Sequence, residues 1–267
     1  MEAARVTTRL QETPASTAPL MPYAGFEFRY RNEEEFRRIC QDVFDQHEYA
    51  FKTYSRSPLI IDAGAHVGAA THYFKLRYPQ ARVRAFEANP VTFALLQENI
   101  RHNRLRDVQA THAALAPEAG VIAFYTTAND DEPGAWGDSA LRQAWHEGED
   151  LAVVEAPAVT LSSQLTEPVA LLKLDIEGME TAVLEEAIPR LHLVDQVILE
   201  FHGSEATPEN TISRVVNALG EGGLTSDVRQ FGSIVSIPGI QYDEPYWLMV
   251  HARRMNRWQK LRRLVGR

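Results

Sequence analysis

The stretch that decides the fold is LIIDAGAHVGAATHYF, residues 59–74. It begins with an apolar run typical of a buried strand, turns at Gly64 and Gly68, and continues with a helical pattern. Glycine lets a backbone turn tightly and approach a ligand where a Cβ would intrude. The same turn also serves plain packing, so this stretch alone leaves ligand binding and packing equally open.

Strand and helix patterns alternate along the chain on both sides of this turn. The strand patterns are PLIIDAG, ARVRAFEANP, VQATHAALA, ALLKLDIEG and DQVILEFHG, and helix patterns such as VTFALLQENIRHN and METAVLEEAIPRL separate them. This rhythm predicts an α/β fold with a mostly parallel sheet and helices on both faces. Runs such as PLII and ALLKL agree, because strands buried on both faces do not alternate.

The flanks have other patterns. Residues 1–22 mix Thr, Ala, Pro and charge without a period, which predicts a mobile arm. Residues 32–51 begin with three glutamates and continue with apolar residues at helical spacing, which predicts an amphipathic helix. The segment TISRVVNALGEGG has a further helix pattern. The segments IVSI and YWLMVHA, which follow it, predict a closing pair of strands. The basic tail from residue 253 is expected to be a solvated amphipathic helix or a site for an anionic partner.

Composition bounds the possible functions. The 267 residues are 45% hydrophobic, which suffices for one large domain with a full core. The net charge of -9 opposes binding to a phosphate backbone, so we expect no nucleic-acid partner. Cys40 is the single cysteine and no signal-peptide pattern opens the chain, which predicts a cytoplasmic protein. No apolar run approaches the roughly 18 residues of a membrane span, so none is expected.

Two acids stand at strand ends, Asp62 and Glu87. Ligands of doubly wound sheets bind at the carboxyl ends of the strands, and the separation of these acids resembles that of an acid receiving ribose hydroxyls. A nucleoside-type ligand is therefore expected. A dinucleotide would need a third loop glycine, which DAGAHVGAA lacks, and Asp62 suits a cationic, amino-bearing ligand better than a phosphate. S-adenosylmethionine has a sulfonium, an amino group and no phosphate.

These motifs, in order and spacing, resemble the FkbM family of S-adenosylmethionine-dependent methyltransferases. The resemblance covers residues 58–203 and also includes THAALAPEAG, GDSAL, VTLSSQL, LLKLDIEGMETAVLEEA and VILEFHG. It implies a Rossmann-like class I methyltransferase fold, with a seven-stranded sheet whose last strand is antiparallel. The expected organisation is an N-terminal arm and helix (1–52) serving as a lid or oligomer contact, a methyltransferase domain (53–252) and a basic tail (253–267).

The resemblance also implies which residues bind S-adenosyl-L-methionine. The glycine loop would hold its methionine part, Glu87 with Ala88 would take the ribose, and the third strand end would border the adenine. The residues concerned are Asp62, Gly64, Ala65, His66, Gly68, Glu87, Ala88, His112 and Ala113. The family often has Asn where His66 stands. We expect His66 to line the turn, although replacement of an amide contact is also open.

The motif LLKLDIEGME places Asp175 and Glu177 at the end of the fourth strand, where a methyl group would leave the cofactor. Two acids at this place could act as a general base, as metal ligands or as caps of the following helix. The helix dipole alone would also favour Glu177 and Glu180 near the helix start. The sequence leaves these roles open.

The fifth strand adds Glu200 and His202, which period two places on one face, near Asp175. Asp175, Glu200 and His202 could bind a hard divalent ion such as Mg²⁺ with open positions for the oxygens of a substrate. His202 could instead accept the substrate proton directly, since its pKa lies near neutrality. A buried His and Glu that satisfy each other are the third possibility.

The expected function is O-methylation of a small molecule, such as a sugar or a natural-product intermediate. A hydroxyl acceptor needs its proton removed or its oxygen polarised, which the cluster of Asp175, Glu177, Glu200 and His202 suits. Residues 128–150, with Trp136 and Trp145, would form a lid. Two alternatives are a nicotinamide-dependent oxidoreductase and a non-catalytic cofactor-binding partner subunit. The sequence leaves open whether the protein forms a homo-oligomer.

Overall fold

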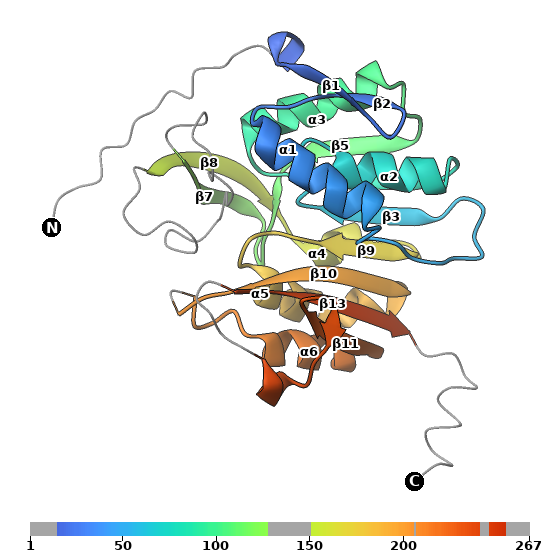
Figure 1. The fold of residues 1–267 in the computed structure, drawn as a ribbon. Helices are drawn as coiled ribbons and strands as arrows, with labels where there is room; N and C mark the ends of the chain where they lie inside the picture. The colour runs from blue at the N-terminus through green and yellow to red at the C-terminus, as the bar shows by residue number, and fades with distance from the viewer. Residues whose placement is uncertain (1–14, 128–150, 206, 241–245, 255–267) are drawn as a thin grey trace, which may run out of the picture.

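A mixed eight-stranded sheet forms the centre of the computed structural model, which describes residues 15–127, 151–205, 207–240 and 246–254 (Figure 1). In sheet order the strands are β12 (Ser233–Ile234), β11 (Leu224–Gln230), β13 (Tyr246–Arg254), β10 (Gln196–Gly203), β9 (Leu171–Leu174), β3 (Leu59–Ala63), β4 (Arg82–Glu87) and β5 (Val108–His112). Strands β5, β4, β3, β9 and β10 are parallel, and β13 is antiparallel to both β10 and β11. This is the predicted Rossmann-like class I methyltransferase fold.

The edge of the sheet differs in detail from the expected seven strands. The eighth strand is β12, which contributes two residues that pair with the end of β11. The segment IVSI was expected to be one of two closing strands, but β11 fills that place instead. Buried residues at Leu224, Val228 and Gln230 fix β11 on the sheet, whereas both residues of β12 are exposed.

The central strands are buried on both faces. All residues of β3 and β9 are buried, which confirms the prediction from their continuous apolar runs. Ile60 packs into one core, with helices α1 (Glu33–Cys40), α2 (Ala69–Arg77) and α3 (Pro90–His102). Leu59 and Ile61 pack into the other, with α4 (Leu161–Gln164), α5 (Glu180–Ala187) and α6 (Ile212–Glu221). Each face of the sheet therefore has its own hydrophobic core.

The N-terminal segment is ordered earlier than expected. Residues 15–22 were predicted to belong to a mobile arm, but a 3-10 turn η1 (Ala15–Thr17) and a hairpin of β1 (Leu20–Tyr23) and β2 (Phe26–Arg29) form there. The amide of Asn99 holds the hairpin against α3: its Oδ1 accepts from Arg29 N at 2.7 Å and its Nδ2 donates to Arg29 O at 2.9 Å. Phe28, which is fully buried, anchors the hairpin in the core. Residues 1–14 lie outside the described residues.

The predicted helix over residues 32–51 begins as expected and ends early. Asn32 caps α1 by accepting a hydrogen bond from Glu35 N at 3.0 Å. The helix then continues as a π-helical turn, η2 (Gln41–Asp45), and the chain turns away at His47, whose φ of 56° is left-handed. Residues 46–51 therefore form a connection that leads toward the sheet rather than a last helical turn.

A second sheet lies beside the first and consists of β6 (Ala114–Leu115), β8 (Leu151–Val159) and β7 (Gly120–Thr127) (Figure 1). Strand β8 was not predicted, because its sequence LAVVEAPAV has no clean alternation and contains Pro157. Thr127 pairs with Leu151, so residues 128–150 connect two neighbouring strand ends. The expected lid over 128–150 lies outside the described residues.

The boundary between the domain and the basic C-terminal tail lies later in the chain than predicted. Arg253 and Arg254 were assigned to the basic tail, but β13 extends to Arg254. The Arg254 guanidinium donates to Val194 O at 2.9 Å and to Gly222 O at 3.1 Å, so it fastens the strand to the loops around it. Residues 255–267 lie outside the described residues. Among the helices that the structure describes, none has the length and apolar content that a membrane crossing needs.

His72 of α2 is fully buried and uncharged in the folded protein. Its Nδ1 donates to Gly68 O at 2.7 Å, and its Nε2 accepts from Asn103 Nδ2 at 3.2 Å, which fits one neutral tautomer. Burial lowers the pKa of His72 from 6.5 to about 4. Between these pH values His72 is protonated in the unfolded chain but neutral in the folded protein, so the free energy of unfolding falls as the pH falls through this window.

We expect His72 to lower the free energy of unfolding by about 3 kcal/mol when the pH falls from 6.5 to 4. Urea denaturation of the parent and of His72→Gln at several pH values measures it. Carboxyl groups contribute to both proteins, so the difference between the two pH profiles isolates His72. Parallel profiles would contradict a buried neutral histidine.

Candidate active site

The glycine loop after β3 lies against the end of β9. Gly64 has a φ of 73°, and its N–H donates to Phe86 O at 3.0 Å. A Cβ at Gly64 would lie 1.7 Å from the backbone oxygen of Asp175, so no other residue fits. Gly68 has a φ of 94° and caps the start of α2. Both glycines that the sequence singled out are therefore required by the backbone itself.

His66 lies within the loop turn. Its φ of 51° is left-handed, a conformation that Asn and His adopt more readily than most residues, so either residue suits this position. The backbone N–H of His66 donates to Glu87 Oε2 at 2.8 Å, and its imidazole Nε2 lies 3.4 Å from Glu35 Oε1 in α1. Ala65 also binds backbone, through its N–H to Phe86 O at 2.9 Å. The turn is thus fixed by both β4 and the N-terminal segment.

Asp62 lies beneath this loop rather than on its surface. It is fully buried, and its Oδ2 accepts a hydrogen bond from the Thr71 hydroxyl at 2.6 Å. Its Oδ1 lies 3.5 Å from the ammonium group of Lys173. The sequence suggested that Asp62 faces an amino group of the ligand, but the structure places its carboxylate against two groups of the protein.

Lys173 is a central residue that sequence reasoning missed. Its side chain is buried in β9, and its ammonium group donates to Gly64 O at 2.5 Å and lies 3.2 Å from Asp175 Oδ2. Burial lowers the pKa of Lys173, but Asp175 and Asp62 outweigh burial and raise it. The charged residue inside the apolar run ALLKL was the available signal, because a lysine there needs carboxylate partners.

The ends of β4 and β5 bring together the residues expected to bind the nucleoside. Glu87 Oε1 accepts from Asn89 N at 2.9 Å, and Ala113 N donates to Glu87 O at 3.0 Å. The His112 Nε2 lies 2.9 Å from Ala88 O, and its ring stacks on Phe93 at 5.2 Å. Glu87, Ala88, His112 and Ala113 are therefore neighbours.

The ends of β9 and β10 bring together the predicted acid and histidine cluster. Asp175, Glu200 and His202 each offer one ligand atom, and these atoms all lie within 4.8 Å of one another. His202 Nε2 is 3.9 Å from Asp175 Oδ1, 3.7 Å from Glu200 Oε1 and 3.5 Å from Glu177 Oε2. The expected convergence of the fourth and fifth strand ends is therefore found, with His202 between the acids.

Neither Glu177 nor Glu180 caps α5 through a side-chain hydrogen bond. Glu180 is fully buried, and its Oε1 accepts from Gly178 N at 2.9 Å and lies 3.2 Å from His202 Nδ1. Asn210 Nδ2 donates to the other oxygen of Glu180 at 2.6 Å. Glu177 precedes the helix with a left-handed φ of 55° and turns toward His202. Glu177 is thus free of the capping role that the sequence left open.

The carboxylates of the cluster hold His202 as a cation. Burial opposes its charged form, but Glu177, Glu180 and Glu200 hold the pKa of His202 well above its usual value. Burial alone would raise the pKa of Asp175, yet Lys173 and His202 hold it below its usual value. An imidazolium donates hydrogen bonds and has no lone pair for a substrate proton. In this state His202 is therefore unsuited to act directly as a base.

Two acids of the cluster keep protons near neutral pH. Burial, together with Asp175 and Glu200, raises the pKa of Glu177 to about 8, although His202 opposes this rise. Burial and then Asp175 raise the pKa of Glu200 to about 7. Carboxyl groups with a pKa near the working pH exchange protons efficiently. In their deprotonated forms, Glu177 and Glu200 are therefore better placed than His202 to accept a proton.

The N-terminal segment contributes two further residues, Glu48 and Tyr49, that no pattern in the sequence indicated. The Tyr49 hydroxyl lies 3.4 Å from Asp175 Oδ2 and 3.5 Å from Glu200 Oε2, and the Tyr49 ring faces the Lys173 ammonium at 5.3 Å. Burial, then Glu200, raises the pKa of the neighbouring Glu48 to about 8. The helix expected over residues 32–51 concealed this contact, because a helix would not lead residues 48 and 49 toward the sheet.

The chemistry of this donor set suits a cation. Within the described part of the chain, the carboxyl groups around the cluster outnumber the cationic groups: Glu48, Asp62, Asp175, Glu177, Glu180 and Glu200 against Lys173 and His202. An excess of buried carboxyl groups attracts positive charge and repels anions. Either a sulfonium or a divalent ion fits such a place.

Comparison with known proteins identifies the family. The model of the family described as "Methyltransferase FkbM domain" matches residues 62–231, which include the glycine loop and the cluster. The chain belongs to the FkbM methyltransferase family. This FkbM-family match begins after Glu48 and Tyr49, so the contacts of these two residues come from a segment that the match does not include.

Three relatives of this FkbM-family chain cover most of their own length in the comparison. Methyltransferase 1 of Beauveria bassiana (strain ARSEF 2860) is 30% identical over 220 residues, 74% of this chain and 82% of the relative. Methyltransferase sdnD of Sordaria araneosa is 29% identical over 194 residues, which are 62% of this chain and 74% of the relative. The 31-O-demethyl-FK506 methyltransferase FkbM of Streptomyces tacrolimicus is 28% identical over 212 residues, which are 67% of this chain and 79% of the relative.

The close approach of Gly64 to β9 can be tested in this FkbM-family fold against another left-handed glycine. Gly25, in the turn of the N-terminal hairpin, has a φ of 85° but nothing within 4 Å of a Cβ. We expect Gly25→Ala to lower the free energy of unfolding by about 1 kcal/mol, for the backbone alone. Gly64→Ala should cost roughly 3 kcal/mol more, for the collision with Asp175. Urea denaturation measures both, and equal losses would contradict the packing of the loop.

Proposed function

We propose that this FkbM-family protein is an S-adenosylmethionine-dependent O-methyltransferase that acts on a hydroxyl group of a small molecule. The observation that carries the proposal is the convergence of Asp175, Glu200 and His202 beside the glycine loop. An acceptor hydroxyl needs a group that removes its proton or polarises its oxygen, whereas a neutral amine is already nucleophilic. A cluster of acids at the methyl-transfer end therefore favours oxygen as the acceptor atom.

The proposed cofactor site uses the loop and the first three strand ends. When bound, S-adenosylmethionine supplies a methyl group on a positively charged sulfur. The backbone of Gly64, Ala65, His66 and Gly68 would hold its amino-acid part. Glu87 and Ala88 would hold the ribose, and His112 and Ala113 would border the adenine. Asp62 would act from beneath the loop, through Thr71 and Lys173, since its carboxylate is already engaged there.

Two routes of acceptor activation fit the cluster. In the first, the deprotonated form of Glu177 or Glu200 accepts the hydroxyl proton, and the raised pKa of each makes it a stronger base than an ordinary carboxylate. Asp175 stays ionised, since Lys173 holds its pKa down, and His202 orients the neighbouring acids. In the second, Asp175, Glu200 and His202 would hold a divalent ion such as Mg²⁺, which would polarise the acceptor oxygen, and His202 would have to be neutral to serve as a ligand.

The proposed substrate class rests on a relative and on charge. The Streptomyces relative is a 31-O-demethyl-FK506 methyltransferase, so that protein is named for transfer to an oxygen of a natural product. A natural-product intermediate or sugar with a free hydroxyl is accordingly the acceptor we propose. The net charge of -9 and the acids of the cluster disfavour nucleic acid.

Cofactor binding provides the first test. Isothermal titration calorimetry should show S-adenosylmethionine binding to the parent protein, and Glu87→Ala should weaken it roughly tenfold or more, because a charged hydrogen-bond acceptor is lost. Glu118→Ala, an exposed acid, serves as the control and should leave the affinity unchanged. A parent protein that binds no S-adenosylmethionine would refute the proposed function.

A titration with Mn²⁺, followed by electron paramagnetic resonance, separates the two routes. If a metal activates the acceptor, the full chain should bind one Mn²⁺, and Asp175→Asn and Glu200→Gln should each weaken binding at least about tenfold. Glu221→Gln, an exposed acid in α6, is the control. The absence of saturable Mn²⁺ binding would exclude the metal route and leave Glu177 and Glu200 as the proton acceptors.

A further inference from the structure

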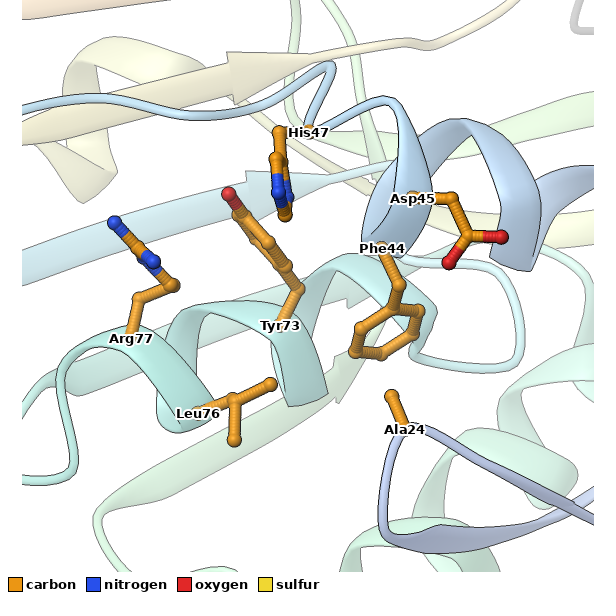
Figure 2. Close-up of a pocket in the computed structure, with 7 residues that line it drawn as sticks. All are labelled: Ala24, Phe44, Asp45, His47, Tyr73, Leu76 and Arg77. Carbon is orange, nitrogen blue, oxygen red and sulfur yellow. The ribbon is translucent and has the colours of Figure 1, made fainter.

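A cavity lies between the N-terminal segment and helix α2, and none of its lining residues belongs to the cluster or the glycine loop. It has a volume of about 320 Å³, and Figure 2 shows its lining: Ala24, Phe44, Asp45, His47, Tyr73, Leu76 and Arg77. The first four come from the N-terminal hairpin and from the region of η2, and the last three from one side of α2. The cavity therefore exists only because the N-terminal segment packs on α2.

Tyr73 provides a polar group in this cavity that the described residues leave without a partner. Its side chain is only 2% exposed, yet its hydroxyl has no hydrogen-bond partner among the residues that the structure describes. Figure 2 shows the hydroxyl end of Tyr73 between the side chains of His47 and Arg77. This hydroxyl is not fully enclosed by the described residues, so it is accessible from the cavity, where water or a ligand group can accept its hydrogen bond.

Two further donors face the same space. Arg77 and His47 line the cavity and are exposed, and neither side chain has an ion pair or a hydrogen bond with any other described residue. Guanidinium, imidazole and phenol groups all donate hydrogen bonds, and guanidinium pairs best with a carboxylate. Asp45 is engaged elsewhere, because its Oδ2 accepts from the Tyr23 hydroxyl at 2.7 Å. Figure 2 shows the Asp45 carboxylate turned away from Tyr73.

The remaining lining is apolar and aromatic. The Phe44 ring meets the Tyr73 ring edge-on, with 5.8 Å between centroids and 80° between planes, and the His47 ring lies 5.9 Å from Tyr73. Leu76 is 49% exposed, which is high for a large apolar side chain next to such a cavity. An aromatic body could cover these groups while its polar end meets the donors.

We propose that this cavity binds a small aromatic carboxylate, with the carboxylate on Arg77 and the Tyr73 hydroxyl and the ring against Phe44 and Leu76. The site is independent of the proposed methyl transfer, since it uses other residues. It adjoins the active site along the chain, however, because His47 directly precedes Glu48 and Tyr49. An occupant would therefore contact the segment whose Tyr49 hydroxyl touches Asp175 and Glu200.

Two matched probes test the site on the full chain: 4-fluorobenzoate and 4-fluorobenzyl alcohol, which share the ring and differ in the carboxylate. Titration followed by fluorine NMR gives both affinities. A ligand of this size should bind with a dissociation constant on the order of 1 mM. We expect the carboxylate to bind about tenfold more tightly than the alcohol, because the charged pair with Arg77 is lost in the alcohol.

Two substitutions that preserve the fold locate the binding. Arg77→Gln should weaken 4-fluorobenzoate roughly tenfold, and Tyr73→Phe, which removes only the hydroxyl, roughly threefold. Arg56→Gln and Tyr54→Phe, at exposed positions outside the cavity, are the matched controls and should leave binding unchanged. No saturable binding up to about 20 mM, equal binding of both probes, or binding that ignores Arg77→Gln and Tyr73→Phe would overturn the proposal.

Discussion

A single buried ammonium group, that of Lys173, joins the parts of the site. It lies against Asp62 at the end of β3, against Asp175 after β9 and against the backbone oxygen of Gly64 in the loop between them. A buried charge is tolerated only with such partners, and removal of one partner typically costs about 3–5 kcal/mol. The position of the loop and that of the first acid of the cluster are therefore set by one side chain.

The rest of the cluster follows from this constraint. Lys173 holds Asp175 ionised, so the neighbouring acids either retain protons or pair with a cation. His202 is that cation. Tyr49 closes the group, with its hydroxyl near Asp175 and Glu200 and its ring on Lys173. The N-terminal segment is thus part of the site and not only a cover of the sheet, which gives a segment outside the FkbM-family match a direct role.

The sequence predicted the mostly parallel sheet, the glycine loop and the convergence of Asp175, Glu200 and His202, because these depend on strands whose patterns are clear and on the residues at their ends. Lys173 was missed although its charge inside an apolar run indicated that it needs carboxylate partners, because the sequence does not show which carboxylates lie beside it. Tyr49 could not be predicted, since its contacts depend on where the chain leaves the helical segment at His47, a left-handed residue without glycine. The second sheet was missed because β8 lacks alternation.

The central claim is that the glycine loop and the cluster form one methyl-transfer site. A crystal structure of the full chain with S-adenosylhomocysteine tests it most directly. The account predicts that the adenosine lies between Glu87 and His112 and that the sulfur faces Asp175, Glu200 and His202. A ligand whose sulfur points away from the ends of β9 and β10, or whose ribose does not reach Glu87, would contradict it.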